Sequence, residues 1–341
     1  MGLQAVSSKA SWQPLVTADT TTTSYWLNWR VPLCAVWVLI SMIFASFLIS
    51  KYEGFRNSGT NQSKAPGILY EDEVWKPCLK GIHPVWLLAF RVVAFSVLLI
   101  LLILNAIVDG GSIFYFYTQW TFALVTIYFG LGSMLSMCGC YEYHDKVGSD
   151  RADNEAEDVE QGSSANGGGE GSNAAKDLSS YGQGKHGRQI ASIWGYVFQI
   201  IFQMIAGAVI LTDFIFWFIM VPFLATKDYE LNFFMINMHT INAVFLLGET
   251  TLNCLRFPWF RIAYFFLWTS FYVIFQWILH ACIALWWPYP FLDLSSSLAP
   301  LWYSIVAIMH ALCFGMFLLI VKLKHSLLSR YFPQSCQCMV K

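Results

Sequence analysis

The stretch AYFFLWTSFYVIFQWILHACIALWW (263–287) runs for 25 residues without an Asp, Glu, Lys or Arg. About 20 consecutive apolar residues, each rising 1.5 Å, form a helix long enough to cross the hydrocarbon core of a bilayer. The chain has seven such apolar runs, at residues 31–50, 84–108, 113–138, 190–222, 233–255, 260–286 and 300–321. Each run is continuous rather than alternating, which favours helices over barrel strands. The sequence therefore predicts an all-α, polytopic transmembrane bundle of about seven spans.

The composition supports this class of protein. Of 341 residues, 57% are hydrophobic and only 12% are charged, against about 25% charged in an ordinary soluble domain. A soluble fold of this size could not hide so much apolar surface. We therefore expect the lipid bilayer as a partner, and neither nucleic acid, a metal nor a cofactor.

The predicted organisation alternates membrane blocks with polar segments. It comprises a tail at 1–30, spans one to three at 31–140, a linker at 141–188, spans four to seven at 189–325, and a tail at 326–341. Run 190–222 is too long for a simple span, and Asp213 and Pro222 predict that it bends or continues past the membrane surface. Residues 141–184 contain ten acidic residues and three Lys or Arg, among many Gly and Ser. Too little apolar surface is available there to fold, so the linker is predicted to be disordered, either as a spacer or as a docking segment for cytosolic proteins.

Positively charged residues predict the orientation, because loops rich in Lys and Arg stay in the cytosol. The side that carries the linker and C-terminus collects sixteen Lys and Arg, whereas the other side has only Lys9, Arg30 and Lys227. The N-terminus is therefore expected outside or in a lumen, with the C-terminus in the cytosol. The plasma membrane and the endoplasmic reticulum are both compatible with these spans.

Paired cysteines lie next to membrane ends on the predicted cytosolic side, where disulfides are rare. These pairs are Cys138 with Cys140 and Cys336 with Cys338. Such thiols are suited to palmitoylation, and inert thiols are the alternative.

Ionisable and polar residues inside the spans carry the chemical information. Counting from the ends of the spans places Thr118, Asp213, His239 and His280 at a similar depth on the non-cytosolic half. Arg91 and Glu249 lie on the opposite half, at equal depth. Because isolated charges in a bilayer are costly, Arg91 and Glu249 are expected to form a structural ion pair.

His239 differs, since an imidazole with an ordinary pKa near 6.5 suits proton transfer close to neutral pH. A hydroxyl held against it becomes a nucleophile, and Thr118 is at the right depth to supply one. Asp213 or His280 could orient the base, and Asn242 could donate to an oxyanion, as could Tyr117 or Gln119. The alternative is structural, because a threonine in a membrane helix often bonds its own backbone and a buried histidine often bridges helices.

Three segments resemble a known family. NMHTINAVFLLGE (237–249), followed by WILHACIALWWPYPFLDLSSSLAP (277–300), resembles the androgen-induced and androgen-dependent membrane proteins, in which a "GMHT"-like segment precedes a "WVYPFL"-like turn. FYFYTQWTFALVTIYFG (114–130) resembles their "YLT" segment and the "YLTNW" of the related rolling stone proteins. The resemblance covers about 105–325, and the span at 31–50 has no counterpart.

The resemblance implies a function. Members of the androgen-induced group are intramembrane hydrolases of fatty acid esters of hydroxy fatty acids, and their threonine and histidine fall on Thr118 and His239. Where that family has an acidic residue three positions after the threonine, this chain has Thr121. "TQW" is closer to the rolling stone branch, which is associated with cell fusion rather than hydrolysis.

Two functions therefore remain open, a lipid ester hydrolase and a non-catalytic protein of membrane organisation, cell fusion or signalling. A receptor or transporter is less favoured, because the sequence shows neither an outer cysteine pair nor an internal repeat.

Overall fold

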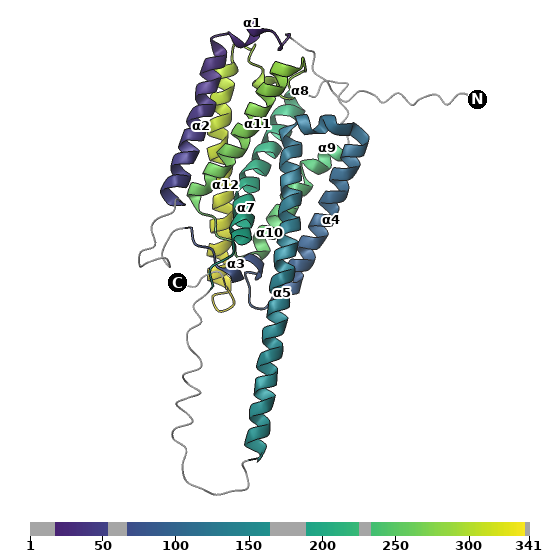
Figure 1. Cartoon of the computed structure of the whole chain (residues 1–341), viewed down its shortest axis with the longest axis vertical. Coiled ribbons are helices and arrows are strands. Elements are labelled where there is room, and N and C mark those ends of the chain that lie inside the picture. The colour runs from purple at the N-terminus through teal and green to yellow at the C-terminus, as the bar shows by residue number, and fades with distance from the viewer. Residues whose placement is uncertain (1–17, 54–66, 164–188, 225–232, 338–341) are drawn as a thin grey trace, which may run out of the picture.

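A computed structural model describes residues 18–53, 67–163, 189–224 and 233–337, and the described chain is helical (Figure 1). The elements are α1 (Thr23–Trp26), α2 (Arg30–Tyr52), α3 (Glu71–Trp75), α4 (Pro84–Asp109), η2 (Gly110–Tyr115), α5 (Tyr117–Ser163), α7 (Ile193–Phe214), η3 (Ile215–Met220), α8 (Val221–Leu224), α9 (Phe233–Met238), α10 (Ile241–Leu252), η4 (Trp259–Arg261), α11 (Ile262–Cys282), η5 (Pro290–Leu292) and α12 (Ala299–Tyr331). The predicted all-α bundle is confirmed.

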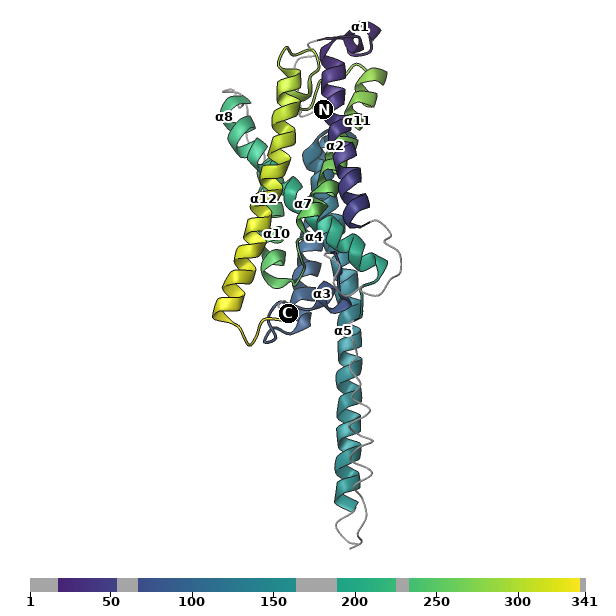
Figure 2. The same cartoon turned by 90° about the vertical axis from the view of Figure 1, so that its left-hand side faces the viewer.

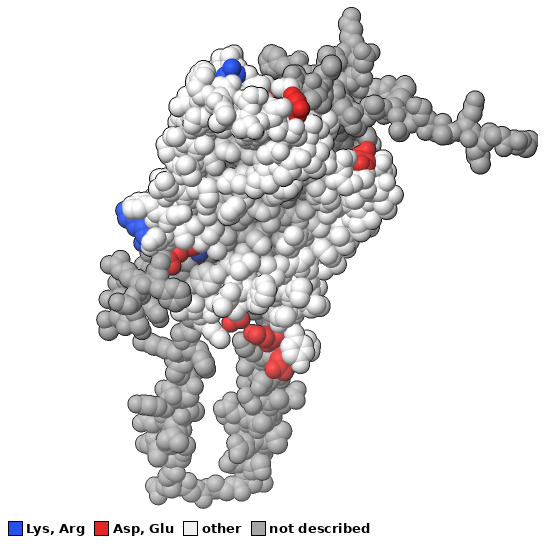
Figure 3. Space-filling model, turned by 45° about the horizontal axis from the view of Figure 1, so that its top comes forward, with Lys and Arg blue, Asp and Glu red and all other residues white. Residues whose placement is uncertain are grey.

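Within the described residues, six helices are long and apolar enough to cross a membrane. They are Arg30–Tyr52, Pro84–Tyr115, Tyr117–Asp145, Ile193–Met220, Trp259–Cys282 and Ala299–Tyr331. These helices expose large apolar side chains, such as Ile43, Ile107 and Leu319, in a way that a soluble surface rarely tolerates. On the face drawn in Figure 3, charged side chains gather near the ends of the bundle and the surface between them is uncharged. The chain is an integral membrane protein.

The helices alternate in direction along the bundle (Figures 1 and 2). We call the end that contains residues 18–29, 110–116 and 283–298 the upper end, as in Figure 1, and the end that contains 67–83, 253–261 and 332–337 the lower end. Helix α7 lies in the interior, where it contacts α5, α11 and α12. Its buried side chains are mostly Phe, Ile, Val and Ala, together with Gln199 and Gln203.

The fifth predicted run, 233–255, is not one continuous helix. It forms α9 and α10, separated by a turn at His239 and Thr240, where Thr240 has φ −124°. A broken helix at membrane depth must find partners for its freed backbone groups. Here the indole Nε1 of Trp217 donates to the carbonyl of His239 at 3.3 Å. The expected seven spans are thus six long helices and one interrupted helix.

Two helices continue past the predicted ends of their membrane segments. Helix α5 continues to Ser163, so residues 141–163 of the predicted disordered linker are helical, while residues 164–188 lie outside the described residues. Helix α12 likewise continues to Tyr331, past the predicted boundary at 325. The reason is cooperativity: once a helix is nucleated, each further residue adds a hydrogen bond without a new nucleation cost. Polar composition therefore marks where a helix leaves the membrane rather than where it ends.

Helix α2, the span without a counterpart in the resemblance, packs against α11 and α12. Its ends are fixed by polar contacts. At the upper end Arg30 donates to the carbonyl of Ser295, and at the lower end Glu53 accepts from Arg261 and Tyr264. The extra helix is therefore part of the bundle rather than a separate anchor.

Candidate active site

A cavity near the upper end of the bundle contains the residues of interest. Its walls come from the start of α5, the end of α7 with η3, the turn between α9 and α10, α11, α12 and residues 289–292. Thr118 and His239 both line it, and their side chains are 8% and 7% exposed. The volume of about 50 Å³ is room for only a few water molecules. The space is thus small and mostly apolar.

His239 is held on two sides. Its Nδ1 lies 3.3 Å from Oδ1 of Asp213, and its ring stacks on Phe216 with centroids 3.8 Å apart and planes 3° apart. The described residues provide no hydrogen-bond partner for Nε2. A carboxylate on one ring nitrogen fixes the orientation of the ring and leaves the other nitrogen for proton transfer. The imidazole is therefore held in a fixed orientation by Asp213 and Phe216.

The sequence produces this arrangement through a change of helix type. Asp213 is in the last turn of α7, and the chain continues as the π-helix η3, which contains Phe216 and Trp217. Short π-helical segments in α-helices are rare and often occur at functional sites. Here the carboxylate, the stacking ring and the indole that holds the carbonyl of His239 come from five consecutive positions. Run 190–222, predicted to bend or to continue past the membrane surface, forms the consecutive segments α7, η3 and α8.

Thr118 is in the first turn of α5, where backbone N–H groups have no partner within the helix. The phenol oxygen of Tyr289 lies 3.2 Å from the Oγ1 of Thr118 and accepts from its backbone N–H at 3.4 Å. No hydrogen bond joins Thr118 to His239 in the described part of the chain. The two side chains line the same cavity without a hydrogen bond between them. Hydrogen bonds between catalytic groups are often long when no substrate is bound.

Tyr289 is the functional candidate that sequence reasoning missed. It lies between two prolines in the segment WPYPFL. In the sequence, that segment served only as part of the resemblance to the androgen-induced membrane proteins. Burial raises the pKa of its phenol, which therefore keeps its proton at neutral pH. A protonated phenol at this position is a hydrogen-bond donor for a negatively charged oxygen.

The loop that carries Tyr289 is itself anchored. The hydroxyl of Tyr25 donates to Oδ1 of Asp293 at 2.8 Å, and Nε1 of Trp287 donates to the hydroxyl of Tyr25 at 3.1 Å. The segment before α2 therefore positions the loop that reaches Thr118.

The other supporting candidates lie elsewhere. His280 contacts two backbone carbonyls, of Gln276 at 2.7 Å and of Trp286 at 3.3 Å, and stacks on Trp287. The amide of Asn242 donates to the carbonyl of Met238 at 2.9 Å, and Asn242 is not among the residues that line the cavity. Of the two groups proposed to orient His239, Asp213 is the one that contacts it.

Two further oxyanion candidates also have other partners. The hydroxyl of Tyr117 bonds Thr269 at 2.8 Å, and the amide of Gln119 donates to the sulfur of Met238. Tyr289 is thus the donor that contacts Thr118.

Arg91 and Glu249 form the expected ion pair, in a position separate from the cavity. NH2 of Arg91 donates to Oε1 of Glu249 at 2.6 Å, and both side chains are 0% exposed. NH1 of Arg91 donates to Ser136 at 2.6 Å, while Glu249 also accepts from the hydroxyl of Tyr128 at 3.0 Å. Because both charges are bonded on several sides, the pair is a structural link between α4, α5 and α10.

Of the cysteines predicted to be palmitoylated, Cys138 is exposed and Cys140 and Cys336 are partly exposed thiols, while Cys338 lies outside the described residues. Cys254, at the same lower end, is disulfide-bonded. Among the described residues no group of three or more His, Cys, Asp or Glu side chains is placed to hold a metal ion. Comparison with known proteins finds no matching family model, curated protein or solved structure.

Proposed function

We propose that this integral membrane protein hydrolyses fatty-acyl esters within the bilayer, with Thr118 as the nucleophile and His239 as the general base. The proposal is based mainly on one observation. Thr118 of α5 and His239 of the turn between α9 and α10 line one cavity, and the carboxylate of Asp213 lies 3.3 Å from the Nδ1 of His239. The resemblance to the androgen-induced membrane proteins, which falls on the same two residues, supports the same assignment.

The proposed chemistry requires neither a metal nor a nucleotide. As Nε2 of His239 takes the hydroxyl proton, Oγ1 of Thr118 attacks the carbonyl carbon of the ester. The tetrahedral intermediate then breaks the ester C–O bond, and the leaving alkoxide takes the proton from His239. Water attacks the acyl–threonine ester, releases the fatty acid and restores Thr118.

The remaining side chains have supporting roles in this proposal. Asp213 stabilises the imidazolium that forms on His239, as the acid of a catalytic triad does. The phenol of Tyr289, which already contacts Thr118 at 3.2 Å, donates to the oxygen that becomes negative. Because the cavity is small and mostly apolar, an acyl ester bound there excludes water, which strengthens these polar contacts.

The experiment is an assay of fatty acid release in liposomes that contain the full chain and a fatty acid ester of a hydroxy fatty acid. Thr118→Val removes the hydroxyl with little change in shape and should abolish release, whereas Thr118→Ser should retain it. The matched control is Thr126→Val on the same helix. Thr126 is also buried, but its hydroxyl bonds the carbonyl of Phe122 at 2.9 Å. Absence of release by correctly folded wild type, or full release by Thr118→Val, would contradict the proposal.

A second candidate is the non-catalytic membrane organiser, and one observation favours it. Helix α5 extends beyond the lower end of the bundle to Ser163 (Figure 2). Residues 141–163 contain eight Asp and Glu and two Lys and Arg. A rigid acidic helix that leaves the membrane is suited to binding a basic partner. Loss of partner capture in a chain without residues 146–163, with ester hydrolysis absent in both chains, would support this alternative.

A further inference from the structure

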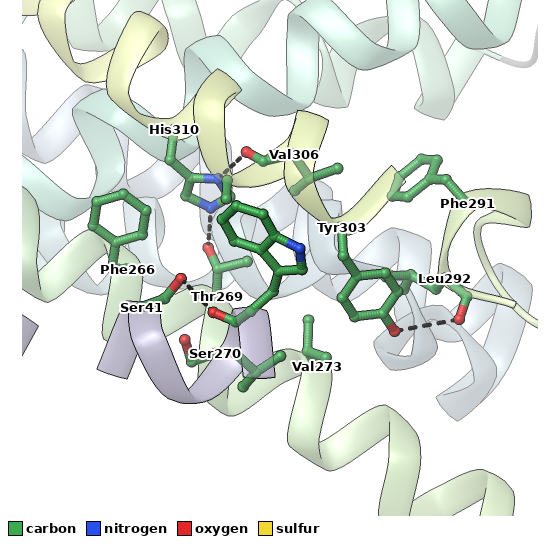
Figure 4. A pocket seen from close by; sticks show the side chains of 13 residues that line it. Ser41, Phe266, Thr269, Ser270, Val273, Phe291, Leu292, Tyr303, Val306 and His310 are labelled. Carbon is green, nitrogen blue, oxygen red and sulfur yellow. Dashed lines mark hydrogen bonds between the residues drawn. The ribbon is translucent and has the colours of Figure 1, made fainter. Parts of the chain in front are cut away.

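A second cavity, also about 50 Å³, lies beside the first and has a wall that the sequence did not suggest (Figure 4). It is bounded by α2, α11 and α12, with Phe291 and Leu292 at one side. Trp37, Val38 and Ser41 of α2 form its outer wall. This cavity is formed by helices of the first, sixth and seventh runs.

The two cavities share part of their lining. Both contain Thr269, Val273, Phe291, Leu292 and Val306. The space beside α2 therefore adjoins the space that contains Thr118 and His239. These shared side chains stand between the two spaces, so a molecule that places one group at Thr118 reaches the second cavity when they move aside.

His310 and Thr269, which both line the second cavity, are hydrogen-bonded to other groups of the protein. Nδ1 of His310 lies 2.7 Å from the carbonyl of Val306, which can only accept, so that nitrogen carries the proton. Nε2 then accepts from the hydroxyl of Thr269 at 2.7 Å, and the oxygen of Thr269 accepts from Tyr117 at 2.8 Å. The chain of bonds ends at a residue that lines the first cavity.

Two other hydroxyls of this cavity are also bonded to protein. Ser41 donates to the carbonyl of Trp37 at 2.9 Å, and Tyr303 donates to the carbonyl of Leu292 at 3.3 Å (Figure 4). The side chains that remain to contact an occupant are mainly Trp, Phe, Val and Leu. Apart from the hydroxyl of Ser270, these side chains are apolar, so the lining favours a hydrocarbon over a charged headgroup.

Helix α2 separates this cavity from the surface that faces lipid. The opposite face of α2 exposes Leu39, Ile43 and Phe47, among others. Between the contacts of Arg30 and Glu53, no side-chain hydrogen bond or ion pair joins residues 31–52 to another element in the described part of the chain. The middle of α2 is therefore held only by apolar contacts, which re-form readily around a guest chain.

We infer that the cavity between α2, α11 and α12 binds the unbranched acyl chain of the lipid substrate and that α2 sets which chain lengths fit. The identity of the chain rests on the proposed function, because this cavity adjoins the one that contains Thr118 and His239. A volume of about 50 Å³ and a mostly apolar lining suit part of one hydrocarbon chain. The chain reaches the cavity from the bilayer beside α2.

Photo-cross-linking tests this binding without requiring hydrolysis. The full chain in liposomes is irradiated with a long-chain fatty acid that carries a diazirine, and the modified peptides are identified by mass spectrometry. We expect modification to concentrate on residues 37–41, 266–273 and 303–310. Ala307→Trp fills the cavity and should reduce this modification at least fivefold, and so should Ser41→Phe from the opposite wall.

The matched control is Ala311→Trp, one turn further along α12, where the side chain is exposed; it should leave the modification unchanged. Thr118→Val should also leave it unchanged, which separates failure of hydrolysis from failure of binding. Modification spread evenly over lipid-facing residues such as Ile43 and Leu319, or unaffected by both cavity-filling variants in folded protein, would overturn the inference.

Discussion

Arg91 and Glu249 show at the scale of single residues how a costly group becomes structural. A buried ion pair is often close to neutral overall, but removing one partner leaves an uncompensated charge and costs about 3–5 kcal/mol. We therefore predict that Arg91→Met alone lowers stability by about that amount, as does Glu249→Leu. The double variant should recover at least half of the loss. Thermal unfolding in detergent micelles measures all four proteins, and additive losses would contradict the ion pair.

Asp213 provides a second prediction at this scale. Asp213→Asn keeps the shape but removes the charge that stabilises a protonated His239. We expect kcat for ester hydrolysis to fall by roughly 10²-fold or more, the range of general acid–base catalysis, with KM little changed. His280→Asn is the matched control, because His280 bonds only backbone carbonyls and should leave kcat within a few-fold of wild type. Equal effects of the two substitutions would mean that Asp213 has no specific role.

At the scale of elements, the interrupted helix at 233–252 is the least predictable part of the site. Hydropathy identifies the apolar run, but a break at His239 and Thr240 contains neither Gly nor Pro. It exists because Trp217 of η3 binds the carbonyl of His239, which is a contact between distant segments. The sequence indicated which polar residues lie in the spans and at what depth. It could not indicate which residue each of them contacts, because that depends on such tertiary contacts. Tyr289, in a loop, could not be assigned by counting along helices.

This interpretation of the break predicts the effect of Trp217→Phe. The ring is retained, while the donor to the carbonyl of His239 is lost. An unsatisfied buried carbonyl costs about 1–3 kcal/mol, so the unfolding temperature should fall and hydrogen exchange around residues 237–242 should become faster. Trp194→Phe is the control, because its side chain is exposed. Unchanged exchange in the Trp217 variant would show that the break is stable without this bond.

At the scale of the whole molecule, the apolar runs predicted the membrane bundle. A segment in lipid must satisfy its own backbone hydrogen bonds, so an apolar run of sufficient length forms a helix regardless of its neighbours.

The orientation of the chain in the membrane stays a prediction. Sixteen Lys and Arg favour a cytosolic lower end, whereas the disulfide at Cys254 is unusual for that compartment. The native Asn61-Gln-Ser lies on the predicted cytosolic side and should carry no glycan. Lys9→Asn creates an acceptor sequence with Ala10 and Ser11 and should be glycosylated, as an endoglycosidase shift would show. The reverse pattern would invert the orientation.

The central claim is that Thr118 and His239 act together on an acyl ester. Its most direct test is trapping: the full chain in liposomes is exposed to a fluorophosphonate with a long alkyl chain, and the modified residue is identified by peptide mass spectrometry. The account predicts an adduct on Thr118 that is lost in His239→Asn and retained in His280→Asn. Unmodified Thr118 in folded wild-type protein, or an adduct that persists without His239, would contradict it.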